Sequence, residues 1–435
     1  MSGSGSRRTD TRRSAWRWHF WAGLIVAPVL LVASITGGVL VFEQEIGLAF
    51  DAEWHTADPV VGAPERISLD ELRPIAEAAT RTGQRLSDVY VFGDPSRTTI
   101  FVFRDDGFDR RTAERVAVHP FTGDVIGVRT DESGTERLLR WMVVLHESLF
   151  AGTIGKLTVE LVTAWSVVLI FTGTMLWWPR SWKILRGVWT VRARGSRYIV
   201  WRDWHTVVAA YLAIPTVLIL VSGMYLSFGT GGAWTLATLA TGGIPETVLA
   251  PPTVERTTGA PPLLQPALDR ASEVRPGSPI YDLSLPYSDN DTIRVVAGSA
   301  GQPIGGAYVY VDPQTGELIT SVSQADIALH GQPLTLAYGV HVGAVGGMPT
   351  KLLALAVCVV LVFSTLTGVY MWLIRKPDGR MGAPKPRRGP ADRWYLVAGA
   401  VACVTMPTFG VSVLMILAGR RMRRLFDTRK HVPTR

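Results

Sequence analysis

The chain has 435 residues, of which 47% are hydrophobic, and its mean hydropathy is positive at +0.21. Its net charge of +8 is unevenly spread, because more than half of the Lys and Arg residues lie in four short segments: 1–17, 180–202, 375–393 and 420–435. This segregation follows the positive-inside rule of membrane proteins and argues against a nucleic-acid-binding surface.

Four apolar runs are long enough to cross a bilayer, which takes about 20 residues. They cover residues 16–42, 157–178, 204–228 and 352–374. With the basic segments in the cytoplasm, the first and third spans lead outward and the second and fourth return, so residues 1–15 stay inside. The first run is too long for a cleaved signal peptide. We therefore expect a polytopic α-helical protein of a bacterial inner membrane.

Two segments outside the cytoplasm, 43–140 and 229–335, are expected to form small α+β domains. The first reads as a helix at 68–82, capped by Ser68 with Glu71, and then four strands at 88–92, 98–104, 115–119 and 125–129. The second reads as a loop at 229–265, a helix at 264–273 and strands at 280–285, 292–297, 307–311 and 318–320. The last strand of each domain follows a Pro-x-Thr-Gly-acidic turn, whose glycine permits a positive φ.

The remaining segments complete the layout. Outer-face stretches join the returning spans in 141–178 and 336–374, and basic loops at 179–203 and 375–393 lie in the cytoplasm. A fifth apolar segment at 394–418 is broken by Pro407 and Gly410 and precedes the basic tail at 419–435. A full crossing would put this tail outside, and a re-entrant hairpin would keep it inside; the sequence leaves both open. The cysteines, Cys358 and Cys403, lie in apolar runs and are expected to be small buried hydrophobic residues.

The strongest feature of the sequence is an internal repeat. At an offset of 195 residues the second half matches the first without a gap, as in the pairs His146 and His341, Lys156 and Lys351, Thr172-Gly173 and Thr367-Gly368, and Trp177 and Trp372. At an offset of 186, His19 matches His205 and Thr36-Gly37 matches Ser222-Gly223. The unit of two spans around a small domain therefore occurs twice. A parallel repeat implies a pseudo-two-fold axis along the membrane normal, so matched residues lie at matched depths.

The repeat selects four of the eight histidines. His19 and His205 lie near the cytoplasmic ends of the first and third spans, and His146 and His341 precede the second and fourth spans at the outer face. Two neutral imidazoles facing one another across a helix bundle can be axial ligands of a haem iron. Each pair is therefore a candidate haem site, which gives two haems per chain.

Other interpretations of these residues stay open. Each histidine can be an ordinary interfacial residue, and a non-haem Zn, Cu or Fe site is an alternative, although no Cys, Asp or Glu accompanies the histidines at ligand spacing. His330, near His341, is a reserve candidate. The Thr-Gly and Ser-Gly pairs are best explained by helix packing, and Lys156 and Lys351 by snorkelling to the outer interface.

The chain resembles the PepSY-associated transmembrane family, the iron-regulated membrane proteins, over roughly residues 15–378. The resemblance rests on Trp18-His19 and Trp204-His205, on Leu145-His146-Glu147-Ser148 followed by Gly155-Lys156, on Thr172-Gly173 before Trp177-Trp178-Pro179-Arg180, and on the two Pro-x-Thr-Gly-acidic turns. The second copy departs from this pattern, because Val340-His341-Val342 lacks the Glu-Ser and Trp372-Leu373-Ile374-Arg375 lacks the second Trp. The outer domains would then be PepSY-like.

The resemblance implies a dihaem reductase of ferric siderophores, with b-type haems held by His19, His146, His205 and His341 and a role in iron uptake. The acceptor would be a ferric siderophore or another ferric complex, and the donor a quinol or a cytoplasmic reductase, since no dinucleotide fingerprint is present. The alternative is a non-enzymatic, membrane-anchored module that binds or restrains an extracytoplasmic partner. Beyond lipid, no further partner is implied. A straight helix from His146 to Trp177 would measure roughly 46 Å, a long separation between two haems unless the glycines bend it.

Overall fold

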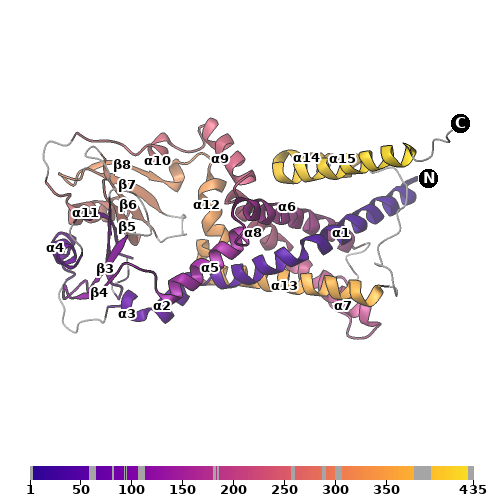
Figure 1. The fold of residues 1–435 in the computed structure, drawn as a ribbon, viewed down its shortest axis with the longest axis horizontal. Coiled ribbons are helices and arrows are strands. Elements are labelled where there is room, and N and C mark those ends of the chain that lie inside the picture. The colour runs from indigo at the N-terminus through magenta and orange to yellow at the C-terminus, as the bar shows by residue number, and fades with distance from the viewer. Residues whose placement is uncertain are drawn as a thin grey trace. The chain divides into compact units, whose positions relative to one another are not determined.

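A computed structural model describes residues 3–429, apart from 58–64, 81–82, 93, 95, 106–112, 180–182, 184–185, 256–259, 287–290, 299–305 and 377–392. Most of the predicted basic loop 375–393, the end of the basic tail and Arg180 thus lie outside the described residues. The chain folds into two compact units (Figure 1). The helical unit comprises residues 1–41, 142–236 and 352–435, and the sheet unit comprises residues 42–141 and 237–351.

Long apolar helices dominate the helical unit. Three are long and apolar enough to cross a membrane among the described residues, and a bent pair can supply a fourth span. The single helices are α1 (Gly3–Leu40, apolar from Ala15), α6 (Gly152–Trp177) and α13 (Met348–Arg375), and the pair is α7 (Arg197–Tyr211) with α8 (Ala213–Tyr225). The predicted span 352–374 lies within α13, and the other three, 16–42, 157–178 and 204–228, run one to three residues past the ends of their helices.

The third span is bent, which the sequence analysis did not predict for the run 204–228. Helices α7 and α8 meet at 66° at Leu212. Pro215 lies three residues further on, where its ring conflicts with the carbonyl of Tyr211 and its nitrogen cannot donate the helical hydrogen bond. Helix α7 begins at Arg197 because Ser196 is its N-cap. The Ser196 side chain accepts from the backbone N–H of Ile199.

The fifth apolar segment, yellow in Figure 1, forms two helices, α14 (Arg393–Thr405) and α15 (Pro407–Arg429). Any side chain at Gly410 would strike the backbone of Cys403, so the two helices fold back on one another at close range. Proline at the first position of α15 suits a helix start, since its missing N–H would have no partner there. The segment is therefore a hairpin with its tip at Met406, and both of its ends leave in the same direction.

The sheet unit contains one continuous eight-stranded antiparallel sheet, ordered β4-β3-β2-β1-β5-β6-β7-β8. The strands are β1 (Arg85–Tyr90), β2 (Thr99–Arg104), β3 (Glu114–Val118), β4 (Val125–Arg129), β5 (Ile280–Ser284), β6 (Ile293–Ala297), β7 (Ala307–Val311) and β8 (Leu318–Ser323). The two outer domains predicted as separate therefore share one sheet. They join where β1 pairs with β5, with Val89 opposite Leu283.

Two amphipathic helices cover one face of this sheet, α4 (Leu69–Ala79) and α11 (Leu264–Val274). Their N-termini cap one another across the join. The Asp70 carboxylate accepts from the backbone N–H groups of Leu264 and Gln265, each at 2.9 Å, and the Gln265 side chain accepts from the Leu69 N–H at 3.0 Å. Each half of the repeat thus completes a helix end of the other half.

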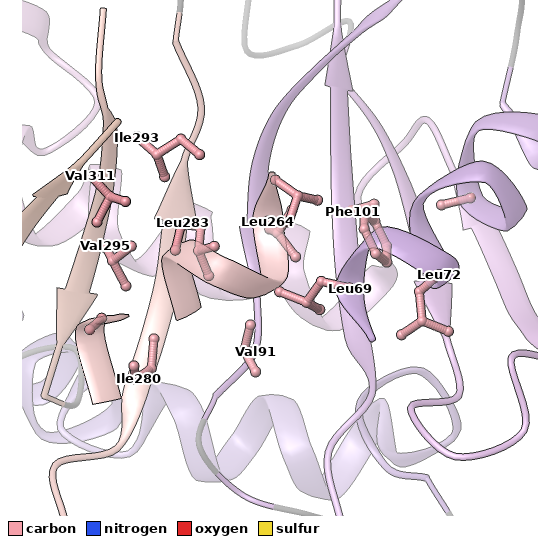
Figure 2. Close-up of a cluster of buried hydrophobic side chains, with 14 of the residues drawn as sticks. Leu69, Leu72, Val91, Phe101, Leu264, Ile280, Leu283, Ile293, Val295 and Val311 are labelled. Atoms are coloured by element: carbon pink, nitrogen blue, oxygen red, sulfur yellow. The ribbon is translucent and has the colours of Figure 1, made fainter. Parts of the chain in front are cut away.

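One hydrophobic core lies between the helices and the sheet (Figure 2). Alternate residues of the strands point into it because side chains alternate between the faces of a strand. Leu69 and Leu264 enter it from the two helices, and Phe101 and Leu283 enter it from strands of different halves. A smaller cluster around Trp54 lies against Ile100, Val102 and Ala117, which point to the other face.

Most predicted elements of the sheet unit match the structure to within three residues. Ser68 is the N-cap of α4, although its side chain accepts from Asp70 rather than from the predicted partner Glu71. The loop predicted at 229–265 is wrong in part, because it contains α9 (Thr230–Ala240) and α10 (Glu246–Leu249). The remaining helices are α2 (Glu43–Phe50), α3 (Ala52–His55), α5 (Gly134–Ser148), α12 (Gln332–His341) and the short turns at 324–326 and 344–346.

Candidate functional site

Two of the four selected histidines meet inside the helical unit. His19 on α1 and His205 on α7 have ring centres 6.3 Å apart, with the ring planes at 84°. Both side chains are half-buried. The sequence repeat predicted this pairing from the matched Trp-His pairs, and the structure brings the two rings together.

The Nδ1 atom of each of these rings contacts a neighbouring helix. Nδ1 of His19 lies 3.1 Å from both the Leu169 carbonyl oxygen and Thr172 Oγ1 on α6. Nδ1 of His205 lies 3.1 Å from Thr367 Oγ1 on α13. The Nδ1 edge of each ring is therefore used for positioning, and Nε2 is the nitrogen left for a ligand role.

The glycine after each threonine makes room for the ring. A Cβ at Gly173 would lie 3.1 Å from His19 Cε1, tighter than an ordinary contact, and one at Gly368 would lie 3.6 Å from His205 Cε1. The interpretation of the Thr-Gly pairs as helix packing alone is therefore incomplete, because these pairs bind the histidine rings. Sequence spacing alone could not show this, since the partners are more than 150 residues apart.

His146 makes the same kind of contact with a third Thr-Gly pair, Thr36-Gly37. Its Nδ1 lies 3.0 Å from both the Ala33 carbonyl oxygen and Thr36 Oγ1 of α1, and a Cβ at Gly37 would lie 3.1 Å from its Cε1. The side chain thus points at α1. Thr36 lies roughly 25 Å beyond His19 along α1 at the rise of 1.5 Å per residue.

A sharp turn between α5 and α6 allows His146 to reach α1. Leu149 and Phe150 adopt positive φ values of 51° and 58°, and Gly152 has a φ of 54°. Gly155 packs so closely on the Ser148 carbonyl that no side chain fits there. The expected straight helix from His146 to Trp177 is therefore broken, and the bend attributed to the glycines is present.

The other histidines that the structure describes lie in the sheet unit. His341 is the half-buried last residue of α12. It belongs to a different unit from His146, so the pairing of these two stays a prediction from the repeat. The reserve candidate His330 is exposed and lies near Gly243. Nδ1 of His119 accepts from the backbone N–H groups of Phe121 and Thr122, a turn-forming role.

The spacing of His19 and His205 fits two axial ligands of one metal. A metal bonded on opposite sides to two imidazole nitrogens at about 2 Å holds the ring centres roughly 6 Å apart. Among the described residues there is no group of three or more His, Cys, Asp or Glu side chains able to hold a metal ion. A haem iron needs fewer ligands from the protein than a bare ion, because the porphyrin supplies the others.

Glu160, a buried carboxylate of α6, is 2% exposed and was not among the residues predicted from the sequence. It accepts from the backbone N–H groups of Gly229 and Thr230, each at 2.7 Å, and from Thr230 Oγ1 at 2.6 Å. An anion at a helix N-terminus satisfies orphan donors and the helix dipole. Glu160 thus fixes the start of α9, and a lone acidic residue in an apolar run was the available signal.

Asp203, two residues before His205, was also missed. Its side chain is fully buried and accepts from the guanidinium groups of Arg192, at 2.6 and 2.8 Å, and Arg202. The Trp177 indole donates to the Val188 carbonyl in the same loop. These contacts hold the segment before α7 against α6 and α7, and so position the helix that carries His205.

An aromatic stack adjoins His19. The indoles of Trp18 and Trp165 stack at 5.7 Å, and Phe409 of the α14–α15 hairpin lies 4.8 Å from Trp165. Ser412 accepts from the Trp165 indole, and the Arg420 guanidinium lies over the Trp18 ring. The hairpin therefore covers the helix pair α1–α6 beside the candidate site.

Comparison with curated proteins gives no match. The model of the PepSY-associated TM region matches residues 16–375, which include the four selected histidines and both halves of the repeat and end before the α14–α15 hairpin. The chain is therefore a membrane protein of this family, the PepSY-associated transmembrane family.

Proposed function

We propose that this protein holds a b-type haem between His19 and His205 and passes electrons across the bacterial inner membrane. The observation that carries the proposal is the 6.3 Å separation of the two rings, whose Nδ1 atoms are both engaged by neighbouring helices. The haem would supply one-electron chemistry. The chain would supply two axial imidazoles, their orientation and an apolar surrounding.

A second haem on His146 and His341 extends the proposal. Its support is the repeat, which matches these two residues at one offset, and the contact of His146 with Thr36 of α1. The break between α5 and α6, with His146 at Thr36 of α1 instead of on a straight extension of α6, supports it as well.

The acceptor we propose is a ferric siderophore or another ferric complex outside the cytoplasm, and the donor is a quinol or a cytoplasmic reductase. Resemblance to dihaem ferric-siderophore reductases supports this assignment. Reduction of the ferric ion would weaken its bonds to hard oxygen ligands, which would release iron for uptake.

The alternative function is a membrane-anchored module that binds an extracytoplasmic partner. The two open edges of the sheet, β4 and β8, favour it, since an edge strand can pair with another chain. Val125, Ile126 and Val128 of β4 are exposed, as are Leu318 and Ile319 of β8. In this function, all four histidines would be replaceable.

Optical spectroscopy distinguishes the haem function from the anchored-module function. The full chain is purified in detergent after expression with ample haem, and oxidised and dithionite-reduced spectra are recorded with haem quantified per chain. We expect a Soret band with sharp reduced α and β bands, and a large loss of haem in His19→Ala and His205→Ala. The control His119→Asn changes a histidine of a turn and should keep its haem. A colourless wild-type protein would reject the haem proposal and favour the anchored module.

A further inference from the structure

The other hydrogen bonds of Thr172 show which atom donates in its contact with His19. Its hydroxyl donates within α6, to Val168 at 2.9 Å or Leu169 at 3.1 Å. A hydroxyl has a single hydrogen, so its oxygen is left as an acceptor for Nδ1 of His19. The Leu169 carbonyl, which also contacts this Nδ1, can only accept. Both partners therefore require a proton on Nδ1, and the lone pair of the neutral ring must lie on Nε2.

The same arrangement recurs at His205. The Thr367 hydroxyl donates to its own helix, to Phe363 at 2.8 Å or Ser364 at 3.1 Å, and its oxygen faces Nδ1 of His205. The two threonines are matched by the repeat, and so are the two histidines. Both histidine rings thus make the same hydrogen-bonding contact with a threonine of a neighbouring helix.

A third copy occurs at His146, away from the first two. The Thr36 hydroxyl donates to Val32 at 2.8 Å or Ala33 at 3.2 Å, and both Thr36 Oγ1 and the Ala33 carbonyl face Nδ1 of His146. Recurrence at three places argues for a shared purpose. A single threonine near a histidine could arise from packing, but three hydroxyls with the same internal bond and the same outward acceptor share one chemistry.

We propose that Thr172 and Thr367 are positioning residues that fix the ligand histidines in the Nδ1–H tautomer. The proposal rests on the haem function of His19 and His205 for its purpose. Each threonine with its following glycine forms a histidine seat, in which the hydroxyl oxygen accepts from Nδ1–H, beside the Leu169 carbonyl at His19, and the glycine admits the ring edge. The tautomer is the one that a metal ligand through Nε2 needs, since that nitrogen then carries a lone pair.

The seats also affect the redox potential. An imidazole whose N–H donates to an acceptor is a stronger electron donor, and it stabilises the ferric over the ferrous state. Loss of the threonine acceptor, which leaves His19 with the Leu169 carbonyl alone, should therefore raise the midpoint potential of the centre. A role in packing alone would not produce this shift.

The first test uses full-length protein with haem bound. Thr172→Val and Thr367→Val keep the side-chain shape and remove the hydroxyl, and Thr172→Ser and Thr367→Ser restore it. We expect the valine variants to keep the haem and to have a higher midpoint potential in a spectroscopic redox titration, and the serine variants to return toward wild type. The control is Thr163→Val, whose hydroxyl donates to Val159 in the same helix α6. Unchanged potentials in the valine variants, or an equal rise in the control, would overturn the proposal.

The second test does not depend on haem. The chain has eight histidines, which can be labelled with 15N and observed by NMR in the haem-free protein in detergent. The His19 and His205 signals, assigned by single substitutions, should report protonated Nδ1 and unprotonated Nε2, and Thr172→Val should change the His19 signal only. Protonated Nε2 on His19 would overturn the proposal, whether or not the protein binds haem. Absence of haem with the expected tautomer would reject the proposed function alone.

Discussion

Glu160→Ala should destabilise the helical unit more than any single hydrogen bond would suggest. The Glu160 carboxylate accepts from two backbone N–H groups and one hydroxyl at the start of α9. Its removal leaves the Gly229 and Thr230 N–H groups with no partner in an apolar setting. Each such loss costs roughly 1–3 kcal/mol. Thr230 Oγ1 lies 3.3 Å from Thr408 Oγ1 and keeps this alternative partner. The two N–H groups together therefore predict a loss of about 2–6 kcal/mol in the free energy of unfolding.

The assay is thermal or denaturant unfolding of the purified protein in one detergent, followed by circular dichroism. Glu160→Gln should lose about half as much as the alanine variant, because the amide oxygen can still accept one bond while its NH2 group faces a donor. The matched control is Glu147→Ala, an exposed carboxylate on α5. The reasoning is refuted when Glu160→Ala is as stable as this control, since the cap would then contribute nothing.

Three other predictions concern separate parts of the fold. Burial raises the pKa of Asp282 to about 6, so its charged form is disfavoured in the folded sheet. The free energy of unfolding should therefore fall as the pH rises from about 4 to 6. In unfolding titrations at neutral pH, Asp282→Asn should be more stable than wild type by about 2–3 kcal/mol. Gly155→Val should clash with the Ser148 carbonyl, open the α5–α6 turn and increase proteolysis there, whereas Gly134→Val, at an open position, should not. Gly410→Leu should separate α15 from Cys403 and make that thiol react faster with maleimide; an unchanged rate would contradict the close hairpin.

The strands and helices of the two domains could be predicted well, because the spacing of apolar residues and the residues that form turns lie close together in the sequence. The strand Val125–Arg129 was predicted to the residue, after a Pro-x-Thr-Gly-acidic turn whose Gly123 has a φ of 76°. The joining of two domains into one sheet was missed, because the β1–β5 pairing links residues almost 200 positions apart. The bend at Leu212 was missed because Pro215 lies in an otherwise uniform apolar run.

The candidate site was partly predictable for a similar reason. The repeat paired His19 with His205, and the structure brings these rings together. The threonines behind them were seen as small residues for helix packing, because their hydrogen bonds to histidine are fixed only when α6 and α13 dock. The role of Glu160 could not be predicted while its partner segment was taken for a loop.

The single sheet has a consequence for how the protein is made. The N-terminal half of the sheet, through β4, is synthesised before α6 and α8, and β5 follows only afterwards. Until β5 arrives, the outer edge of β1 has no partner, and the N-terminus of α4 lacks its Gln265 cap. The early half thus presents an open, apolar-backed strand edge during biogenesis, a known risk for aggregation and wrong pairing. A chain that stops after the second span would keep that edge of β1 without the partner strand that the second half supplies.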